Sequence, residues 1–145
     1  MFNNAFAGGN VTSEGEDGVA IKGYEPVAYF ESQAATPGSS AHALTWQDAT
    51  WHFSSAENKA EFAASPKKRA PQYGAYCAIG TRVGLKIDSQ PELFKVVDGK
   101  LYLNSSEKAH GMWLKDIPGH IQVADENWLK IETKTAAEFK AAHEI

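Results

Sequence analysis

The residue best suited to soft-metal or nucleophilic chemistry is Cys77, the only cysteine among the 145 residues of the chain. It lies in the segment 70–80, where Tyr73 and Tyr76 precede the thiol and Gly80 follows it. A single cysteine excludes an internal disulfide within the chain and any metal centre built from several thiolates.

Three roles for Cys77 are open on this pattern. The thiol can fill a small space in the core, because free cysteine is among the most buried residue types. It can be a soft ligand for copper or zinc, or a reactive thiol whose pKa is lowered by a cation, an imidazole or a helix N-terminus. If residues 73–80 form a helix, Tyr73, Cys77 and Gly80 share one face of it.

The chain is also rich in aromatic residues, which make up 11% of it. A small core does not hide so many polar ring tips with each one hydrogen-bonded, so some rings are expected to line a cleft while most tryptophans pack in the core. The residues that we expect to form a ligand site are Cys77, Tyr73, Tyr76, Tyr29 and Trp113.

Composition narrows the classes of partner. The formal net charge is -4 and the pI is about 5.7, so nucleic acid is not an expected partner. No apolar run approaches the length of a membrane span, and residues 1–7 lack the basic start and apolar stretch of a signal peptide. The expected partner is a small molecule or a metal ion, and the oligomeric state is left open.

The length favours a single domain. Residues 1–18 are rich in Gly, Asn, Ser and acidic residues and predict a flexible N-terminal arm, so the domain is expected to span residues 19–145. Residues 27–30 predict a short strand after Pro26. Residues 43–46 and 50–53 predict a hairpin around a turn at 47–49. Ser54 and Glu57 then predict the capping box of a helix that Pro66 stops.

The clearest local signal is a second hairpin. Residues 94–97 and 100–103 flank Asp98-Gly99, a pair that accepts the positive φ angles of a type I′ turn. Asn104 with Glu107 predicts the cap of a further helix, Pro118 suits the first turn of another, and Thr135 with Glu138 predicts a terminal one. The expected fold class is α+β, with both hairpins in one small antiparallel sheet packed against several helices.

Four motifs carry a resemblance to a known family. Residues 23–30 read GYEPVAYF, residues 51–58 read WHFSSAEN, residues 70–78 read APQYGAYCA and residues 98–104 read DGKLYLN. Their order resembles the stand-alone YHS-domain proteins of bacteria over about residues 19–128. The resemblance implies an exported, periplasmic protein.

Better-known YHS domains occur in metal-handling proteins, where cysteines in the first strand and at the start of the helix are taken as ligands. The matching segments 25–30 and 53–58 contain no cysteine here. The family's metal ligands therefore do not carry over directly. The candidates for binding a soft metal ion, copper or zinc, are Cys77, because its thiolate is a soft ligand, and His52. His52 is chosen because it lies on the strand that leads into that helix. The other histidines, at 42, 110, 120 and 143, show no close pairing with one another or with His52.

Two functions from different classes follow. The first is a non-catalytic binding module that holds a metal ion or small ligand near Cys77. The second is a thiol-dependent enzyme or redox protein in which a histidine acts as base for Cys77. The chain has no second cysteine to resolve a disulfide intermediate, which favours binding.

Overall fold

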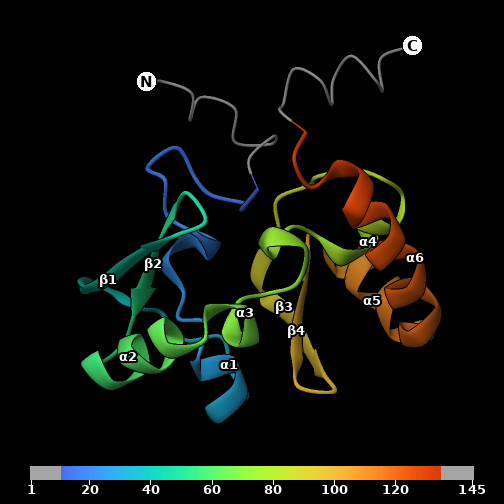
Figure 1. Ribbon diagram of the computed structural model, residues 1–145. Helices are drawn as coiled ribbons and strands as arrows, with labels where there is room; N and C mark the ends of the chain where they lie inside the picture. The colour runs from blue at the N-terminus through green and yellow to red at the C-terminus, as the bar shows by residue number, and fades with distance from the viewer. Residues whose placement is uncertain (1–10, 135–145) are drawn as a thin grey trace.

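The computed structural model in Figure 1 describes residues 11–134 as an α+β domain. Strand β1 (Ser39–Trp46) pairs antiparallel with β2 (Ala49–Phe53), and β3 (Gln90–Val97) pairs antiparallel with β4 (Lys100–Asn104). The helices, with η marking a single tight turn, are η3 (Ile21–Gly23), α1 (Ala28–Glu31), α2 (Ala56–Ala64), α3 (Pro66–Arg69), η4 (Tyr73–Ala75), α4 (Ala78–Arg82), α5 (Glu107–Lys115) and α6 (Ile117–Ile131). The predicted fold class is confirmed.

The two hairpins form two separate sheets, so the prediction of one shared sheet is wrong. Each hairpin has one edge already occupied by a neighbouring loop. The Ala20 amide donates to the Thr50 carbonyl of β2 (2.9 Å), and the Gln72 amide donates to the Leu101 carbonyl of β4 (2.8 Å). Since these loops satisfy the backbone groups that a third strand would use, β2 and β4 do not extend into a common sheet.

Both hairpin turns have two residues with positive φ. Asp98 and Gly99 have φ of 52° and 77°, as the predicted turn requires. Gln47 and Asp48 have φ of 53° and 62°, so the first turn is one residue shorter than predicted and the following residue already belongs to β2. The turn residues and strand preferences were sufficient to predict both hairpins, because each pair of strands is joined directly by its turn.

The strand predicted for residues 27–30 is instead the short helix α1. Glu25 causes the difference, because its Oε2 accepts from the amide groups of Val27 (2.6 Å) and Ala28 (3.1 Å). A carboxylate bound to successive amides starts a helical turn and overrides the strand preference of Val27 and Tyr29.

The helix caps lie one or two residues from their predicted places. The Ser55 hydroxyl, and not Ser54, accepts from the Asn58 amide at the start of α2, and Ser106, and not Asn104, caps α5. Pro66 ends α2 and begins α3, as predicted. Pro118 lies in the first turn of α6, also as predicted. The cap predicted at Thr135 and Glu138 lies outside the described residues.

The segment 11–18 belongs to the folded domain, which corrects the prediction of a flexible arm through residue 18. Thr12, Ser13 and Glu14 are buried. The Ser13 amide donates to the Gly74 carbonyl (2.7 Å), and the Thr12 hydroxyl donates to the Gln47 carbonyl (3.0 Å). These bonds join the segment to the β1–β2 turn and to η4.

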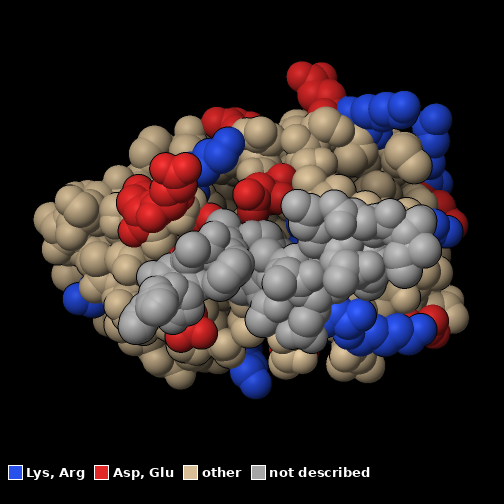
Figure 2. Space-filling model, turned by 90° about the horizontal axis from the view of Figure 1, so that it is seen from above, with Lys and Arg blue, Asp and Glu red and all other residues tan. Residues whose placement is uncertain are grey.

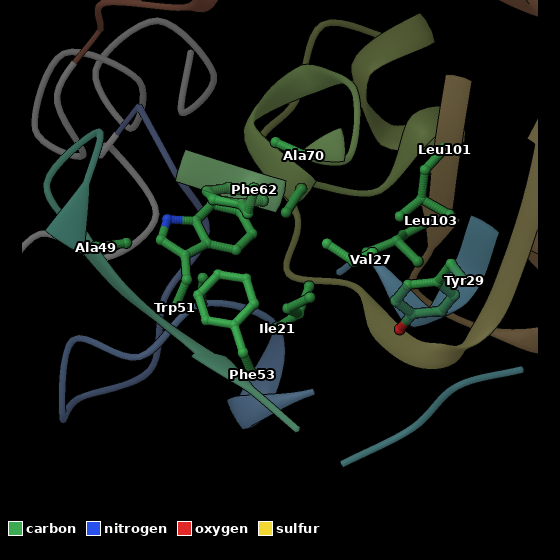
Figure 3. Packing of buried hydrophobic residues seen from close by; sticks show 12 residues of the cluster. Ile21, Val27, Tyr29, Ala49, Trp51, Phe53, Phe62, Ala70, Leu101 and Leu103 are labelled. Carbon is green, nitrogen blue, oxygen red and sulfur yellow. The ribbon is translucent and has the colours of Figure 1, made fainter. Parts of the chain in front are cut away.

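The buried side chains form two cores, one on each side of β4. In the first, Phe62 of α2 packs against Trp51 and Phe53 in tilted geometry, each at 5.2 Å between ring centroids (Figure 3). The Trp46 ring meets Phe62 edge-on at 5.7 Å. Phe62 therefore packs on the first hairpin, as predicted. The members of the second core are Tyr73, Ala78, Tyr102, Trp113 and Ala124. Leu101 and Leu103 belong to the first core and Tyr102 to the second, because alternate residues of a strand face opposite sides.

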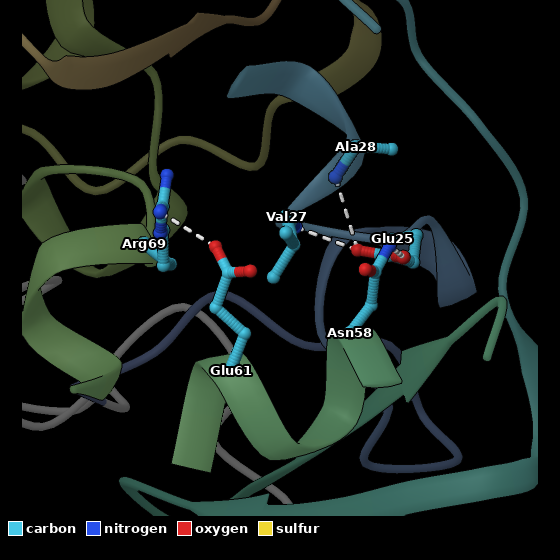
Figure 4. Close-up of polar contacts among 6 residues, drawn as sticks. All are labelled: Glu25, Val27, Ala28, Asn58, Glu61 and Arg69. Carbon is cyan, nitrogen blue, oxygen red and sulfur yellow. Dashed lines mark hydrogen bonds and ion pairs between the residues drawn. The ribbon is translucent and has the colours of Figure 1, made fainter. Parts of the chain in front are cut away.

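Glu25 is fully buried and connects three segments of the first half (Figure 4). Besides the two amides of α1, its Oε1 accepts from the Ser54 hydroxyl (2.9 Å) and from the Asn58 side-chain amide. Both carboxylate oxygens are thus occupied by donors, which is the condition under which a buried charge is tolerated.

Replacing Glu25 with Gln is expected to lower the free energy of unfolding by about 2 kcal/mol, because the new NH₂ group faces donors instead of acceptors. Urea denaturation measures the change. Glu61→Gln is the matched control, since the ion pair of Glu61 with Arg69 is partly solvent-exposed and its loss is expected to cost at most about 1 kcal/mol. Equal losses in the two variants would contradict the central role of Glu25.

Within residues 11–134, no helix combines the length and apolar character that crossing a membrane requires.

Candidate functional site

The segment that surrounds Cys77 is not one helix. Tyr73, Gly74 and Ala75 have φ of 60°, 60° and 68°, so η4 is a left-handed turn, and α4 begins only at Ala78. The expectation that Tyr73, Cys77 and Gly80 share a helical face is therefore wrong. Left-handed backbone costs about 1 kcal/mol or more for a residue with a side chain. Tyr73 and Ala75, on either side of Gly74, therefore need compensating contacts.

Three hydrogen bonds from distant segments hold the left-handed turn. The Tyr73 hydroxyl donates to Asp125 Oδ1 of α6 (2.8 Å), and the Ser89 hydroxyl donates to the Ala75 carbonyl (2.7 Å). The third is the bond from the Ser13 amide to the Gly74 carbonyl. The turn is thus fixed from the N-terminal segment, from α6 and from the segment before β3.

Cys77 is buried, with 1% of its surface exposed, and it caps α4. Its Sγ accepts from the Gly80 amide (3.4 Å), and its S–H donates to Asn104 Oδ1 (3.5 Å). The same Asn104 oxygen accepts from the Ile79 amide (3.1 Å). Neither partner of the thiol is a base or a cation, so this placement matches the interpretation of Cys77 as a buried core thiol.

The other residues of the predicted ligand site are divided among separate places. Tyr29 lies in the first core, where its hydroxyl donates to the Pro91 carbonyl (2.8 Å). Trp113 lies in the second core against Tyr102, at 5.0 Å between centroids. Tyr73 and Tyr76 are the pair that the structure does bring together, since each ring lies just over 6 Å from the ring of Trp128.

His52, the second predicted metal ligand, is half-buried on β2 and lines an open depression beside Gly23 and Gly38. The hydrogen-bond partners of Cys77 lie on β4 and α4, and not on β2, the strand that carries His52. Within residues 11–134 no group of three or more His, Cys, Asp or Glu side chains is arranged to hold a metal ion. Among these residues, neither Cys77 nor His52 therefore belongs to a group of three such ligands.

A cavity of about 230 Å³ lies beside the left-handed turn. Aromatic rings from four segments line it, those of Trp46, Trp51, Tyr73 and Trp128. The polar and small residues of its wall are Thr12, Gln47, Lys67, Ala70, Pro71, Gln72, Gly74 and Glu132, together with Val11. The cavity therefore sits where β1–β2, η4 and α6 meet.

Two opposite charges stand at this cavity. Lys67 of α3 is exposed and Glu132 follows α6, and neither side chain makes a hydrogen bond or ion pair within the part of the chain that the structure describes. In contrast, the Tyr73 hydroxyl already donates a hydrogen bond to Asp125. Burial and this bond to Asp125 raise the pKa of Tyr73 above its usual range. The charged groups are thus available to a bound molecule, and the tyrosine is a fixed neutral wall.

Lys86 supports the cavity from the side of α6. Its Nζ lies 5.4 Å from the ring centroid of Trp128 and 5.5 Å from that of Tyr76, and it donates to the Glu132 carbonyl (2.8 Å). Burial lowers the pKa of Lys86 to about 8. The ammonium group therefore fixes the end of α6 and the Trp128 ring by cation–π and hydrogen-bond contacts.

Of the residues that line the cavity, the sequence predicted only Tyr73 individually. The signal for the others was the excess of aromatic residues, which predicted that some rings line a cleft. Nothing in the sequence indicated that Trp46, Trp51 and Trp128 are those rings, because each comes from a different segment. Lys67 and Glu132 carry no sequence signal, since a short basic run such as residues 67–69 and a single acidic residue are both typical of a solvated helix face.

Comparison of the chain with protein-family models, with curated proteins and with solved structures finds no match. Membership of the YHS family stays a prediction from the four motifs.

Proposed function

We propose that this protein is a non-catalytic binding module, and that its ligand is a compact small molecule with a planar ring held in the aromatic cavity. The observation that carries the proposal is the wall of four aromatic rings, with the side chains of Lys67 and Glu132 beside them and making no hydrogen bond to another described residue. Sites for small molecules are typically apolar hollows with a few convergent polar groups.

The volume limits the size of the ligand. About 230 Å³ corresponds to roughly eight water molecules at liquid density. A single ring system with one or two polar substituents fits this space, whereas a nucleotide or an extended peptide does not. Stacking on tryptophan and tyrosine faces favours a planar or cationic group over a branched aliphatic one.

The wall of the cavity is rigid, which favours binding over catalysis. The left-handed turn is fixed by hydrogen bonds to Ser13, Ser89 and Asp125, so a ligand meets a surface that is already formed. Cys77 supports this wall from behind, because α4, which it caps, packs against α6 and its Trp128. A metal ion at Cys77 has no comparable support, since neither hydrogen-bond partner of the thiol is a usual ligand for copper or zinc.

The test uses three small probes that share one benzene ring and differ in charge: benzamide, benzoate and phenyltrimethylammonium. Binding is measured by quenching of tryptophan fluorescence and by ligand-observed NMR. We expect at least one probe to bind with a Kd in the millimolar range or tighter, and Trp46→Leu to weaken it at least tenfold. Lys67→Gln and Glu132→Gln show which charge contacts the probe, since only the relevant change alters the preference among charges.

Cys77→Ser is the matched control, because serine is close in size to cysteine and because Cys77 does not line the cavity. It is expected to bind the probes as the parent does. If Cys77→Ser abolished binding while Trp46→Leu left it unchanged, the site would lie at the thiol and not in the aromatic cavity.

A further inference from the structure

Glu14 is a buried carboxylate that lacks a partner for one oxygen. The residue is 7% exposed, and its Oε2 accepts no hydrogen bond from any described residue. An unpaired charge at such a depth is costly, so it points to a bound group or to protonation. Glu25, by contrast, has donors on both carboxylate oxygens.

Glu14 lines a small cavity of about 60 Å³ whose wall combines oxygen-bearing side chains with Val19, Ile21 and Lys22. Asp88 contributes a second carboxylate, and Ser13 and Ser89 contribute hydroxyls. The Ser13 hydroxyl donates to Asp88 Oδ1 (2.6 Å) and the Ser89 hydroxyl donates to the Ala75 carbonyl (2.7 Å). Because both hydroxyl hydrogens are already used, the lone pairs of both oxygens are free to act as ligands.

The surrounding charges favour a cation. The carboxylates of Asp48 and Asp17 lie near Glu14 and add to the negative potential there. Lys22 also lines the cavity, but its ammonium group donates to Gln90 Oε1 (2.8 Å) on the exposed side. Figure 2 shows acidic side chains gathered over the left half of the molecule, and the largest groups of Lys and Arg lie at the right. The local field therefore attracts positive ions.

We propose that this cavity is a calcium site, with Glu14 and Asp88 as charged ligands and the Ser13 and Ser89 hydroxyls as neutral ones. Calcium takes six to eight oxygen ligands, and two carboxylates with two hydroxyls offer up to six. The space is about that of two water molecules, enough for the ion and one water. Magnesium normally keeps several waters, and copper and zinc favour nitrogen or sulfur ligands, so none of these three fits as well.

The site is independent of the proposed small-molecule binding, and the two cavities have no lining residue in common. Ser13 and Ser89 both hold the left-handed turn, through the Gly74 and Ala75 carbonyls. A bound ion would fix the N-terminal segment and the turn to each other.

Calcium chloride alone is the probe, added to metal-free full-length protein and measured by isothermal titration calorimetry and by thermal unfolding. We expect a Kd of about 1 mM or tighter and a Tm increase of several degrees at saturation. Magnesium is expected to bind at least tenfold more weakly. Glu14→Gln and Asp88→Asn, which keep the size of each side chain, are each expected to weaken calcium binding at least tenfold.

Asp17→Asn is the matched control, because this carboxylate lies near Glu14 but does not line the small cavity. The Kd of Asp17→Asn for calcium is expected to stay within about threefold of the parent value, because a charge that does not contact the ion changes only the local potential. The proposal is overturned if calcium at 10 mM gives no calorimetric signal and no change in Tm, the result expected if the cavity holds only water. It is overturned as well if Glu14→Gln binds calcium as tightly as the parent does. It is also overturned if Asp17→Asn loses as much affinity as Glu14→Gln, which would indicate a diffuse surface effect.

Discussion

Raising the pH from 10 to 11 is expected to lower the free energy of unfolding, with about 3 kcal/mol of the loss coming from three tyrosines that stay protonated in the fold. Tyr29, Tyr73 and Tyr102 are each at most 5% exposed. Burial is the first cause that raises the pKa of each, with Tyr102 raised to about 12 and Tyr29 and Tyr73 raised further. Each contributes about 1 kcal/mol to the effect.

The sign follows from the direction of the shifts. The folded-state pKa of each tyrosine lies above its unfolded value near 10, so the unfolded chain releases protons first as the pH rises. The stabilisation is complete below pH 10 and is lost above it. Lys86 acts in the opposite sense, since its lowered pKa relieves a burial cost between about pH 8 and 10.5. Stability is therefore expected to rise slightly before it falls.

Urea denaturation at several pH values measures this loss, and the near-ultraviolet absorbance of tyrosinate shows whether these rings ionise only on unfolding. Tyr73→Phe is expected to reduce the slope above pH 10 by about a third, because one of the three groups is removed. Lys86→Met is expected to remove the preceding rise. Reversible ionisation of all five tyrosines in the folded protein near pH 10 would contradict the burial of their hydroxyls.

Gly74→Ala is expected to cost about 4 kcal/mol, the largest effect of any single methyl group in the described chain. A Cβ at this position would overlap the Val11 carbonyl oxygen and would lie 3.2 Å from Cη2 of Trp128. The residue also has φ of +60°, which an L side chain adopts only with strain. Both the N-terminal segment and the wall of the aromatic cavity would have to move.

Gly84→Ala separates these two causes. Gly84 has φ of +82°, but a Cβ there meets nothing within 4 Å, so only the conformational cost of about 1 kcal/mol is expected. Thermal and urea unfolding of both variants measure the difference. If Gly74→Ala cost no more than Gly84→Ala, the contact between Val11 and the left-handed turn would not contribute to stability.

The elements that were predicted correctly depend on residues close together in the sequence. The Asp98-Gly99 turn and the two hairpins follow from local turn chemistry and strand preference. Pro66 and Pro118 mark helix boundaries because the proline ring fixes φ and the residue has no amide hydrogen to donate, and both properties belong to the residue itself. No distant contact competes with these signals.

The elements that were predicted wrongly depend on one side chain serving a distant segment. Glu25 makes residues 28–31 helical and also takes the Ser54 hydroxyl, which leaves Ser55 to cap α2. Asn104 bonds to Cys77 and Ile79, so Ser106 caps α5. The local pattern identified a polar residue correctly in each case. The pattern did not indicate which backbone or side-chain group would be the hydrogen-bond partner of that residue.

The candidate site was predictable only in part for the same reason. The segment 70–80 was identified, and Tyr73 does line the cavity. The chemistry of Cys77 drew attention to the thiol, but a soft atom in the sequence does not reveal whether the fold exposes it. The left-handed turn was missed because only Gly74 among its three residues favours positive φ.

Strand β4 lies between the two cores, and its neighbouring side chains alternate between them. Leu101 and Leu103 pack on one side and Tyr102 on the other, so displacement of this strand opens both cores at once. We therefore expect the domain to unfold as one cooperative unit, although each half has its own hairpin and helices. A change that loosens the hairpin half is expected to lower the stability of the helical half through these three residues.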